Sequence, residues 1–527
     1  MLSLEPPALR LRRLLRGVRD GALLVEFPEA SDAEANGAAV ALARSLSAAP
    51  ASGFRDAIPA ARTLLVLFDV RGASRGAVGE AIERAAARTE PAGGASRLVR
   101  IPVAYGGAAA LDLEELARGA GLPESELASR HAAAEYRVAF LGFAPGFPYL
   151  TGLPAELRAA RLASPRPRVP AGAVAIGGPW TGIYPAAMPG GWRLIGRTSA
   201  RLFDAGASPA ALLAAGDRVR FEPVAESALP VVGAAVARPR ASGGRPAFRV
   251  EAPGFFASVQ GAPRYGLGSS GVPPGGAMDL RSLARANALV GNGPDDPALE
   301  IALAGPELVA LEDSVVALAG AGEIDGRPIP LAEAFLLPAG RRLRIGRVHG
   351  GARVYLAVGG GFDAGDAPGQ PPPRLAGGQV LAVRPPSPAR GPGRDPGGGE
   401  PGQERVLRVA AGPHSDHFEP PSVDRLLAAS WRVSPVSDRR GLRLEGERLE
   451  HSRPAEVPPQ GTVPGTIQVP GDGQPIVLGP DGPVTGGYPQ IGTVIEADLP
   501  LLGQAAPGDR LRFRIATRED AEPGWRE

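Results

Sequence analysis

The stretch PAGAVAIGGPWTGIYP occupies residues 170–185, and a related stretch, PGTIQVPGDGQPIVLGPDGPVTGGYP, occupies residues 464–489. Both are apolar, β-branched runs that end in Thr-Gly-x-Tyr-Pro, a pattern typical of strands joined by tight turns. Each is followed by a similar closing run, AGDRVRF at 215–221 and PGDRLRF at 507–513, and a weaker copy, PAGRRLRI, lies at 338–345. The repetition predicts a fold built by duplication of β-rich modules, with functional surfaces between the modules.

The length and composition of the chain set the outer limits. A chain of 527 residues is too long for one core and predicts three or four domains. Its 73 glycines and 58 prolines predict dense turns and few long helices. No apolar run approaches the roughly 20 residues that cross a bilayer, and residues 1–17 lack the apolar segment of a secretory signal. We therefore expect a cytoplasmic protein with no membrane partner.

Cysteine and lysine are both absent from the sequence, so all 57 basic residues are arginines. Their absence excludes a thiol nucleophile, a thiolate metal site, a P-loop lysine, a Schiff-base lysine and a biotinyl-lysine on this chain. Any bound anion must be held by arginine side chains, helix N-termini or backbone N–H groups. The net charge is only +2 and the arginines do not cluster with aromatics, so nucleic acid is not an expected partner.

The order of patterns along the chain predicts a mainly β fold with α+β portions. We expect a small N-terminal α/β domain at 1–95, a β domain at 96–225, a linker at 226–246, a β-rich domain at 247–384, a flexible Gly/Pro-rich loop at 385–404 and a second β domain at 405–527.

Several segments carry signals for individual elements. Ser31 and Glu34 form a capping box that predicts a helix to about residue 47, and TLLVLFDV at 63–70 predicts a strand buried on both faces. Asp112, with Glu115 at the capping-box position, predicts another capped helix. Further predicted helices are 76–89, 279–290 and a short one around 422–429, and further strands are 23–27 and 98–105.

Histidines are few enough to consider singly. His131 ends a predicted short helix just before a buried strand; a helix C-terminus favours the protonated imidazole, and histidine suits proton transfer near neutral pH. Both acid/base catalysis and simple packing are open for it. His414 and His417 would face one another on a helix, but the preceding Gly-Pro favours a turn and no third ligand is evident, so we predict no metal site.

The segment SDRRGLRLEG at 437–446 concentrates arginines. If 439–444 is extended, Arg439 and Arg443 point to the same face, and two guanidinium groups on one face suit a carboxylate or a phosphate. The alternative is a solvated strand with one internal Asp–Arg pair.

Four hydroxyl groups lie in tight glycine turns, a geometry that presents polar groups at a pocket rim. They belong to Thr181, Tyr184, Thr485 and Tyr488. Purely structural turns are equally open.

Longer motifs resemble a pair of bacterial families. HAAAEYRVAFLGFAPGFPYLTGLP with RVPAGAVAIGGPWTGIYPAAMPGGWRLIGRT is similar to allophanate hydrolase subunit 1, a family that includes the B component of 5-oxoprolinase. SVQGAPRYGLGSSGVPPGGAMDLRSLARANALVGN, with SDRRGLRLEG and the stretch from residue 465, is similar to subunit 2, which includes the C component of 5-oxoprolinase. The chain resembles the two components fused head to tail, over about nine-tenths of its length.

The resemblance implies a fold and a role. It implies tandem cyclophilin-like β-barrel modules, and B and C components of an ATP-dependent 5-oxoprolinase that activate the lactam 5-oxoproline before a separate protein, the A component, completes ring opening to glutamate. The implied cofactor is ATP with Mg²⁺, no biotin is attached to this chain, and a homo-oligomer is expected. Together with the residue patterns, the resemblance suggests His131, Asp438 and Tyr488 as catalytic residues. It suggests as substrate- or anion-binding residues Arg439, Arg443, Arg264, Gln260, Thr181, Tyr184, Thr485 and Gln468.

The sequence departs from the family pattern in three places. The usual Gln-Asp-x-Gly-Arg segment reads Gln-Gly-Ala-Pro-Arg at 260–264, and Arg440 replaces a Met before Gly441. After YLAVGGGF at 355–362, GDAPGQPPPRL replaces a longer loop rich in Ser, Arg and Thr. If that loop binds substrate or nucleotide, we expect altered or lost activity.

Two other functions are compatible with the same resemblance. One is a carboxyltransferase-like component of a biotin-dependent urea or amide carboxylase, which would accept a carrier protein in trans because this chain has no lysine. The other is a non-catalytic regulator of a histidine kinase.

Overall fold

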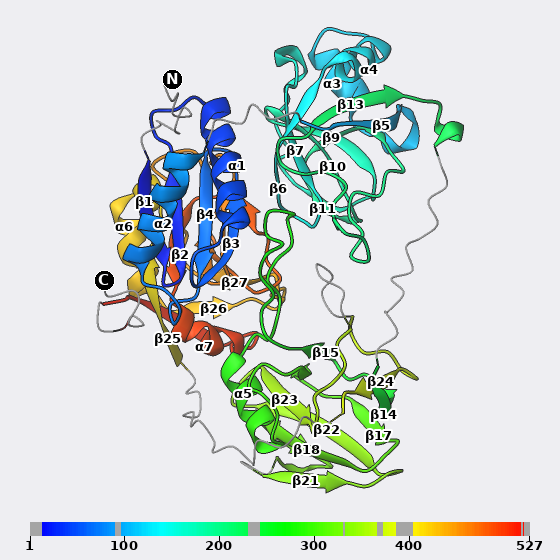
Figure 1. The fold of residues 1–527 in the computed structure, drawn as a ribbon, viewed down its shortest axis with the longest axis vertical. Helices are drawn as coiled ribbons and strands as arrows, with labels where there is room; N and C mark the ends of the chain where they lie inside the picture. The colour runs from blue at the N-terminus through cyan, green and yellow to red at the C-terminus, as the bar shows by residue number, and fades with distance from the viewer. Residues whose placement is uncertain are drawn as a thin grey trace, which may run out of the picture.

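A computed structural model describes residues 13–89, 96–229, 243–329, 333–365, 373–385, 404–517 and 520. Figure 1 shows four β-rich parts joined in chain order. Most of the linker predicted at 226–246 and nearly all of the loop predicted at 385–404 lie outside the described residues, as does 366–372 of the segment that replaces the Ser/Arg/Thr loop.

The first part is one antiparallel sheet covered by two helices. The sheet has the order β1-β2-β4-β3, and α1 begins at the predicted capping box, in which the Ser31 side chain accepts from the Glu34 N–H and the Glu34 carboxylate accepts from the Ser31 N–H. Every residue of β4 is buried, as predicted. The elements are β1 (Leu14–Arg19), β2 (Ala22–Glu26), α1 (Asp32–Ala48), β3 (Phe54–Pro59), β4 (Thr63–Phe68) and α2 (Arg75–Arg88).

The second part is a closed barrel with the cyclic strand order β10-β7-β6-β13-β5-β12-β9. Its strands are β5 (Leu98–Tyr105), β6 (Tyr136–Leu141), β7 (Pro148–Thr151), β9 (Ala173–Gly177), β10 (Trp180–Ile183), β12 (Arg193–Arg197) and β13 (Arg218–Pro223). Outside the barrel lie α3 (Leu113–Gly119), α4 (Glu124–Ala133) and the pair β8 (Arg166–Val169) and β11 (Met188–Gly190).

Asp112 does not cap α3 with its side chain, in contrast to the sequence prediction. Its carboxylate instead accepts hydrogen bonds from the Leu194 N–H at 2.7 Å and from Arg166 at 2.8 Å. Glu115 pairs with Arg193 at 2.7 Å rather than closing a capping box. Both side chains thus connect the helix to the barrel.

The third part consists of two sheets that enclose one apolar core. The six-stranded sheet contains β20 (Arg327–Pro328), β19 (Ala321–Ile324), β22 (Arg342–His349), β17 (Glu307–Ala310), β14 (Arg245–Ala252) and β24 (Val380–Val383). The five-stranded sheet contains β15 (Phe256–Gln260), β16 (Ala298–Ala302), β23 (Arg353–Val358), β18 (Ser314–Ala319) and β21 (Ala334–Leu337). Helix α5 (Leu280–Leu289) begins at Asp279, whose side chain accepts from two backbone N–H groups.

The fourth part is a second closed barrel, with the order β25-β32-β29-β30-β27-β26-β33. Its strands are β25 (Glu404–Ala411), β26 (Trp431–Val433), β27 (Gly441–Glu445), β29 (Thr466–Gln468), β30 (Ile476–Leu478), β32 (Gln490–Val494) and β33 (Arg510–Ile515). Its other elements are α6 (Pro420–Ala428), α7 (Leu499–Gly503) and the pair β28 (Gln460–Gly461) and β31 (Thr485–Gly486).

The two barrels have the same topology, which confirms the predicted duplication. Both follow one cyclic order when β5 is matched with β25 and β13 with β33. The closing runs seen in the sequence form β13 and β33, and each pairs in parallel with the first strand of its barrel. The weaker copy at 338–345 enters β22 of the sandwich instead. The protein is therefore mainly β, with tandem cyclophilin-like barrels.

The Thr-Gly-x-Tyr-Pro copies do not occupy equivalent positions in the two barrels. Thr181 lies on the barrel strand β10, whereas Thr485 lies on β31, which pairs with β28 outside the barrel. The topological counterpart of β31 in the first barrel is β11, since each is the second strand of a two-stranded pair beside its barrel. The sequence repeat thus reveals the duplication, but aligning the two Thr-Gly-x-Tyr-Pro copies pairs Thr181 and Thr485, which lie on strands that are not equivalent in the two barrels.

The N-terminal sheet packs on the last barrel, far away in the sequence (Figure 1). Its helix-free face buries Leu24, Ile58 and Leu65 against Val463 and Val484. The loop at 261–278 passes between the parts: Asp56 of β3 accepts from the Gly266 and Gly268 N–H groups at 2.9 and 2.8 Å. All four parts are therefore held in one arrangement.

Within the described residues, none of the helices has the length and apolar character needed to cross a bilayer.

Candidate functional site

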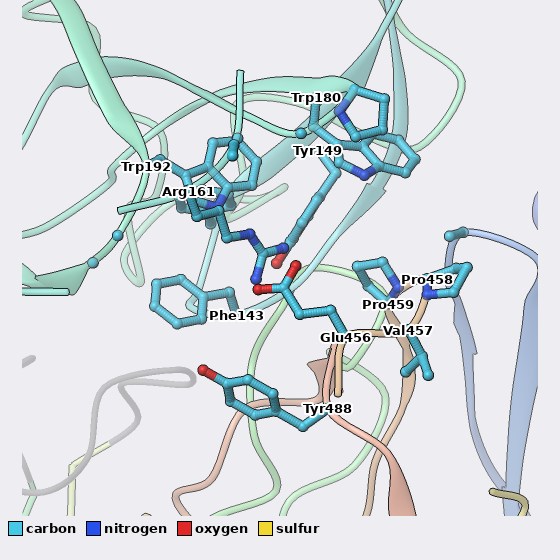
Figure 2. Close-up of a pocket in the computed structure, with 18 of the residues that line it drawn as sticks. Phe143, Tyr149, Arg161, Trp180, Trp192, Glu456, Val457, Pro458, Pro459 and Tyr488 are labelled. Carbon is cyan, nitrogen blue, oxygen red and sulfur yellow. The ribbon is translucent and has the colours of Figure 1, made fainter. Parts of the chain in front are cut away.

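A cleft of about 1890 Å³ lies between the two barrels and the start of α1. One wall belongs to the first barrel and carries aromatic side chains, and the opposite wall belongs to loops of the last barrel (Figure 2). The residues that line the cleft include Phe143, Phe147, Tyr149, Arg161, Trp180, Tyr184, Trp192, Arg443, Glu456, Asp472 and Tyr488.

The aromatic wall is a packed unit rather than a set of separate rings. Trp192 lies edge-on to Phe147 and Tyr149, with ring centroids 5.3 and 5.4 Å apart. Gly177 and Gly182 leave room for this indole, because a Cβ on Gly177 would lie 2.5 Å from its ring. Edge-to-face pairs of this kind hold rings in fixed orientations, so the wall presents a preformed surface to a ligand.

Phe143 stands at the base of the cleft in an unusual backbone conformation. Its φ is 63°, which side chains other than glycine rarely adopt, and its side chain remains 39% exposed. The backbone N–H of Phe143 donates to the Thr485 hydroxyl at 3.2 Å. The neighbouring Gly142 allows this approach, since a Cβ there would lie 1.8 Å from the Thr485 Oγ1 atom. A residue of the last barrel thus holds a strained residue of the first.

Arg161 extends from the first barrel across the cleft. Its guanidinium carbon lies 6.0 Å from the centroid of Trp192, and a terminal nitrogen lies 3.9 Å from the position that a Cβ would take on Gly487 of the last barrel. Figure 2 shows the guanidinium between Trp192, Tyr149 and the Glu456 carboxylate. Within the described residues Arg161 makes no hydrogen bond or ion pair, although it is only partly exposed.

Tyrosine hydroxyls gather around this guanidinium. Burial raises the pKa of Tyr149 to about 12, with Arg161 opposing the shift and Tyr184 and Tyr488 adding to it. Burial likewise raises the pKa of Tyr184 to about 12, opposed by a backbone N–H of Trp192 and by Arg161. Both phenols are therefore neutral near pH 7 and available as hydrogen-bond donors.

Three of the residues proposed from the sequence line the cleft, namely Tyr184, Tyr488 and Arg443. They come from both barrels, as expected for a surface between modules. Thr485 borders the same region through its bond to Phe143.

Arg439 and Arg443 do not share a face, in contrast to the sequence prediction. Strand β27 begins only at Gly441, so Arg439 lies in the preceding turn and points inward. Its guanidinium donates to Glu300 at 2.6 Å, to Asp481 at 2.7 and 2.9 Å, and to the Gly276 carbonyl at 2.6 Å. With four of its N–H groups in these hydrogen bonds, Arg439 connects the last barrel to the sandwich and does not line the described cleft.

His131 lies in the core of the first barrel, fully buried. Its Nε2 donates to the Thr181 hydroxyl at 2.9 Å, which itself donates to the Ala175 carbonyl, and its Nδ1 accepts from Tyr105 at 2.8 Å. Burial lowers the pKa of His131 to about 3, which corrects the expectation of a protonated imidazole. A catalytic role for it stays a prediction, and neither its position nor that of Thr181 places it among the described cleft residues.

The remaining proposed residues are distributed outside the cleft. The Asp438 carboxylate accepts from the Arg440 and Gly441 N–H groups and closes a turn. Gln260 is buried and donates to Ser258 at 3.0 Å, whereas Arg264 is exposed. Gln468 is buried on β29.

Comparison with known proteins identifies the family to which this chain belongs. Carboxyltransferase domain, subdomain C and D, matches residues 14–213, and carboxyltransferase domain, subdomain A and B, matches residues 270–515. The chain belongs to the carboxyltransferase-domain family. The segment between the two matches, residues 214–269, contains the last strand of the first barrel and the first two strands of the sandwich. The cleft is lined by residues of both matched regions.

Individual relatives cover each region. The chain is 39% identical over 227 residues to the B subunit of 5-oxoprolinase from Bacillus subtilis (strain 168), covering 41% of this chain and 95% of that protein. It is 35% identical over 282 residues to the C subunit of 5-oxoprolinase from Escherichia coli (strain K12), covering 51% and 91%. It is 32% identical over 306 residues to urea amidolyase of Lachancea kluyveri, covering 51% of this chain but 17% of that protein.

A solved structure shows the same family architecture in one chain. The crystal structure of TTHA0988 matches with a TM-score of 0.82 and 36% identity, covering 95% of this chain and 100% of that one. The fold described above is therefore shared with that structure over nearly the whole molecule.

Sequence reasoning missed Arg161 and the aromatic wall as site residues. Arg161 lies in AARLASPRPRV at 159–169, which contains three arginines, and no motif in the sequence distinguishes Arg161 from the other two. The usable signal is the stretch GFAPGFPYL, in which aromatic residues stand among glycines and prolines. The position of Arg161 opposite Gly487 depends on contacts across more than 300 residues, which local patterns do not contain.

Proposed function

We propose that this chain combines the B and C components of an ATP-dependent 5-oxoprolinase and activates 5-oxoproline for ring opening to glutamate together with a separate A component. The observation that carries the proposal is a single cleft walled by both barrels, with Arg161 on one side and Tyr488 and Arg443 on the other. Relatives named as the two separate subunits match the chain over most of their own lengths. A fused chain fixes the pairing of the two walls.

The chemistry of a lactam explains what such a cleft must supply. An amide carbonyl is a poor electrophile, so its oxygen has to be converted into a better leaving group before water can open the ring. Negative charge develops during this activation, and positioned donors stabilise it best where water is excluded. The neutral phenol of Tyr184 is such a donor, and the packed aromatic wall excludes water. Glu456 and Asp472 are carboxylates on the opposite side that can accept a proton.

The residues of the cleft also fit the cofactor that the family implies. The volume of about 1890 Å³ exceeds the roughly 300–1,000 Å³ of a typical single-ligand pocket, which leaves room for a nucleotide beside a small lactam. Trp180 offers a ring for a base, and Arg443 offers donors for phosphate oxygens. Mg²⁺ commonly takes one or two carboxylates together with phosphate oxygens, and Glu456 and Asp472 are of that type. Bound ATP would supply the phosphoryl group that activates the lactam oxygen.

The test is glutamate release from 5-oxoproline and ATP by the purified chain, with and without an A component from the same source. We expect glutamate only in the combined mixture. Arg443→Ala should lower the rate because it removes a cleft donor, and His131→Ala tests the catalytic role suggested from the sequence. No glutamate with a folded chain and a verified partner would overturn the proposal.

A second candidate function is the carboxyltransferase part of a biotin-dependent urea or amide carboxylase. The specific observation in its favour is the similarity to urea amidolyase over half of this chain. With no lysine, this chain would have to receive the carboxyl group from a separate biotinylated carrier. Transfer of labelled carboxyl from such a carrier to urea, without glutamate formation from 5-oxoproline, would favour this candidate.

A further inference from the structure

We propose that Arg161 binds the carboxylate of the substrate, so that the cleft selects a small planar ring amide bearing a carboxylate over the same ring without one. This inference deepens the proposed function and takes the ring amide from it. The carboxylate subsite consists of Arg161 and the phenol of Tyr149, with the charge of Glu456 opposite them.

Arg161 differs from the other arginines of the cleft in having unused donors in a partly enclosed position. Arg62 is also partly buried, but its guanidinium pairs with Asp32 and donates to the Ala30 carbonyl at 2.8 Å. Arg137, Arg158 and Arg443 are exposed to solvent. A guanidinium that is desolvated on one side and left unpaired is destabilised until an anion arrives, so an anionic ligand gains most at Arg161.

The surroundings of Arg161 suit a carboxylate better than a phosphate cluster. A guanidinium presents parallel N–H donors that match the two oxygens of a carboxylate. Tyr149, whose pKa burial raises to about 12, adds a neutral donor beside it. In Figure 2 the Arg161 guanidinium lies beside the aromatic rings of Trp192 and Tyr149. One guanidinium with neutral donors matches a single negative charge.

The aromatic residues around the subsite suit a flat ring. Phe143 is held with its side chain in the cleft by the bond from its N–H to Thr485. Trp192 lies beneath the guanidinium and is fixed by contacts to Phe147 and Tyr149. A ring amide attached to the bound carboxylate would therefore lie against preoriented aromatic surfaces, which reduces the entropy lost on binding.

Glu456 supplies a competing charge on the opposite wall. Its carboxylate points towards Arg161 in Figure 2, although the two groups form no ion pair within 4.0 Å. A bound carboxylate would take the position between them and experience repulsion from Glu456. Neutralising Glu456 should therefore strengthen carboxylate binding. Loss of a residue that only contacts the ligand would weaken binding instead.

The experiment measures binding without turnover. The full chain, free of ATP and of the A component, is titrated with 5-oxoproline and with 2-pyrrolidinone, the same lactam without the carboxylate, by calorimetry and by tryptophan fluorescence. We expect 5-oxoproline to bind at least about tenfold more tightly, as for a charge-assisted pair. Arg161→Gln should remove this preference, Arg161→Lys should retain part of it, and Glu456→Gln should raise the affinity for 5-oxoproline about threefold.

A matched control is Arg84→Gln, which removes one arginine from an exposed pair with Glu80 on α2 and should leave both affinities unchanged. Circular dichroism and the thermal midpoint verify that each variant is folded; if Arg161→Gln fails to fold, Arg161→Lys and Glu456→Gln decide the matter. Equal affinities for the two lactams, a preference that survives in Arg161→Gln, or no binding of 5-oxoproline at millimolar concentration would each overturn the inference.

The outcomes separate this inference from the proposed function. Glutamate formation with a preference that does not depend on Arg161 would overturn the inference and leave the function. Arg161-dependent binding of the carboxylate without glutamate formation in the presence of the A component would support the inference and overturn the function.

Discussion

Thr485 of the last barrel accepts a hydrogen bond from the backbone N–H of Phe143 in the first barrel, at 3.2 Å, although 342 residues separate them. The bond holds Phe143 at a φ of 63° and keeps its ring at the cleft. Thr485 is almost fully buried, so the bond is shielded from water. The two halves of the chain therefore shape the cleft through a direct contact and not merely through proximity.

Replacing Thr485 by valine tests this contact. Valine has nearly the shape of threonine but cannot accept a hydrogen bond, so the N–H of Phe143 loses its partner and the free energy of unfolding should fall by about 1–3 kcal/mol. Affinity for 5-oxoproline should also fall, because Phe143 is released from its strained position. Urea denaturation and calorimetry measure the two effects. Thr485→Ser keeps the hydroxyl and should restore most of both; equal losses in the serine and valine variants would contradict the explanation.

A buried ion pair connects the sandwich to the last barrel. Burial would raise the pKa of Glu300, but Arg439 and Arg353, with the Tyr355 hydroxyl and the Met278 N–H, outweigh it and hold this pKa below its ordinary value. The carboxylate of Glu300 is fully buried and remains charged. Of its partners, Met278 belongs to the loop at 261–278 and Arg439 donates to the Gly276 carbonyl of that loop.

Arg439→Met should therefore destabilise the protein strongly. It leaves the Glu300 charge without its closest partner, and losing one member of a buried pair typically costs about 3–5 kcal/mol. The measurement is the urea midpoint, with Arg443→Met, on the exposed side of β27, as the control. The double variant Arg439→Met/Glu300→Leu should be more stable than Arg439→Met alone, because it removes the unpaired charge. A destabilisation below about 1 kcal/mol would show that the pair does not join the domains.

The buried His131 predicts a specific dependence of stability on pH. Burial lowers its pKa to about 3 in the folded chain, whereas an unfolded chain titrates near its ordinary value of about 6.5. Below pH 6.5 the unfolded state binds a proton that the folded state does not, so stability is full above pH 6.5. It should decrease by up to about 1.4 kcal/mol per pH unit towards pH 3.

His131→Gln isolates this contribution. Glutamine does not titrate, so the difference in unfolding free energy between pH 7 and pH 5 should be smaller in the variant than in the parent chain by about 2 kcal/mol. Denaturation at the two pH values measures it.

The pH profile of glutamate release should lack a step belonging to His131. If the step near pH 6.5 is present and disappears in His131→Gln, the imidazole reaches the reaction and the core assignment is wrong.

The local elements could be predicted because their causes are local. The capping box of Ser31 and Glu34 satisfies backbone groups three residues apart. The continuous apolar run that follows Thr63 is enough to predict that β4 is buried on both faces. The duplicated closing runs became β13 and β33 because each copy supplies both the turn and the strand. These features require no knowledge of distant parts.

The site could be predicted only in part because its geometry arises from distant contacts. An extended segment at 439–444 would place Arg439 and Arg443 on the same face, but the turn closed by Asp438 separates an inward arginine from an outward one. Asp112 has the sequence position of a cap, yet the Leu194 N–H and Arg166 compete successfully for its carboxylate. The partners of Asp112 lie 54 and 82 residues away, and Asp481 and Glu300, which hold Arg439 inward, lie 42 and 139 residues away.

Gly142 of the first barrel lies directly against the Thr485 side chain of the last barrel. A Cβ on this residue would lie 1.8 Å from Thr485 Oγ1 and 2.9 Å from its Cβ, which is closer than atoms can approach. Gly142→Ala should therefore push the barrels apart, open the cleft and increase the radius of gyration measured by small-angle scattering, with loss of 5-oxoproline binding. Gly119→Ala is the control, since a Cβ there meets nothing within 4 Å.

A compensating change makes the explanation specific. Thr485→Gly removes the side chain that alanine would strike, so the double variant Gly142→Ala/Thr485→Gly should return to the compact shape even though it lacks the bond to Phe143. Its affinity for 5-oxoproline should match that of Thr485→Val rather than that of the parent chain. If Gly142→Ala stays compact, or if the double variant stays open, the approach of these two residues does not determine how the barrels are placed. The cleft would then have to be held by the loop at 261–278 and the Arg439–Glu300 pair alone.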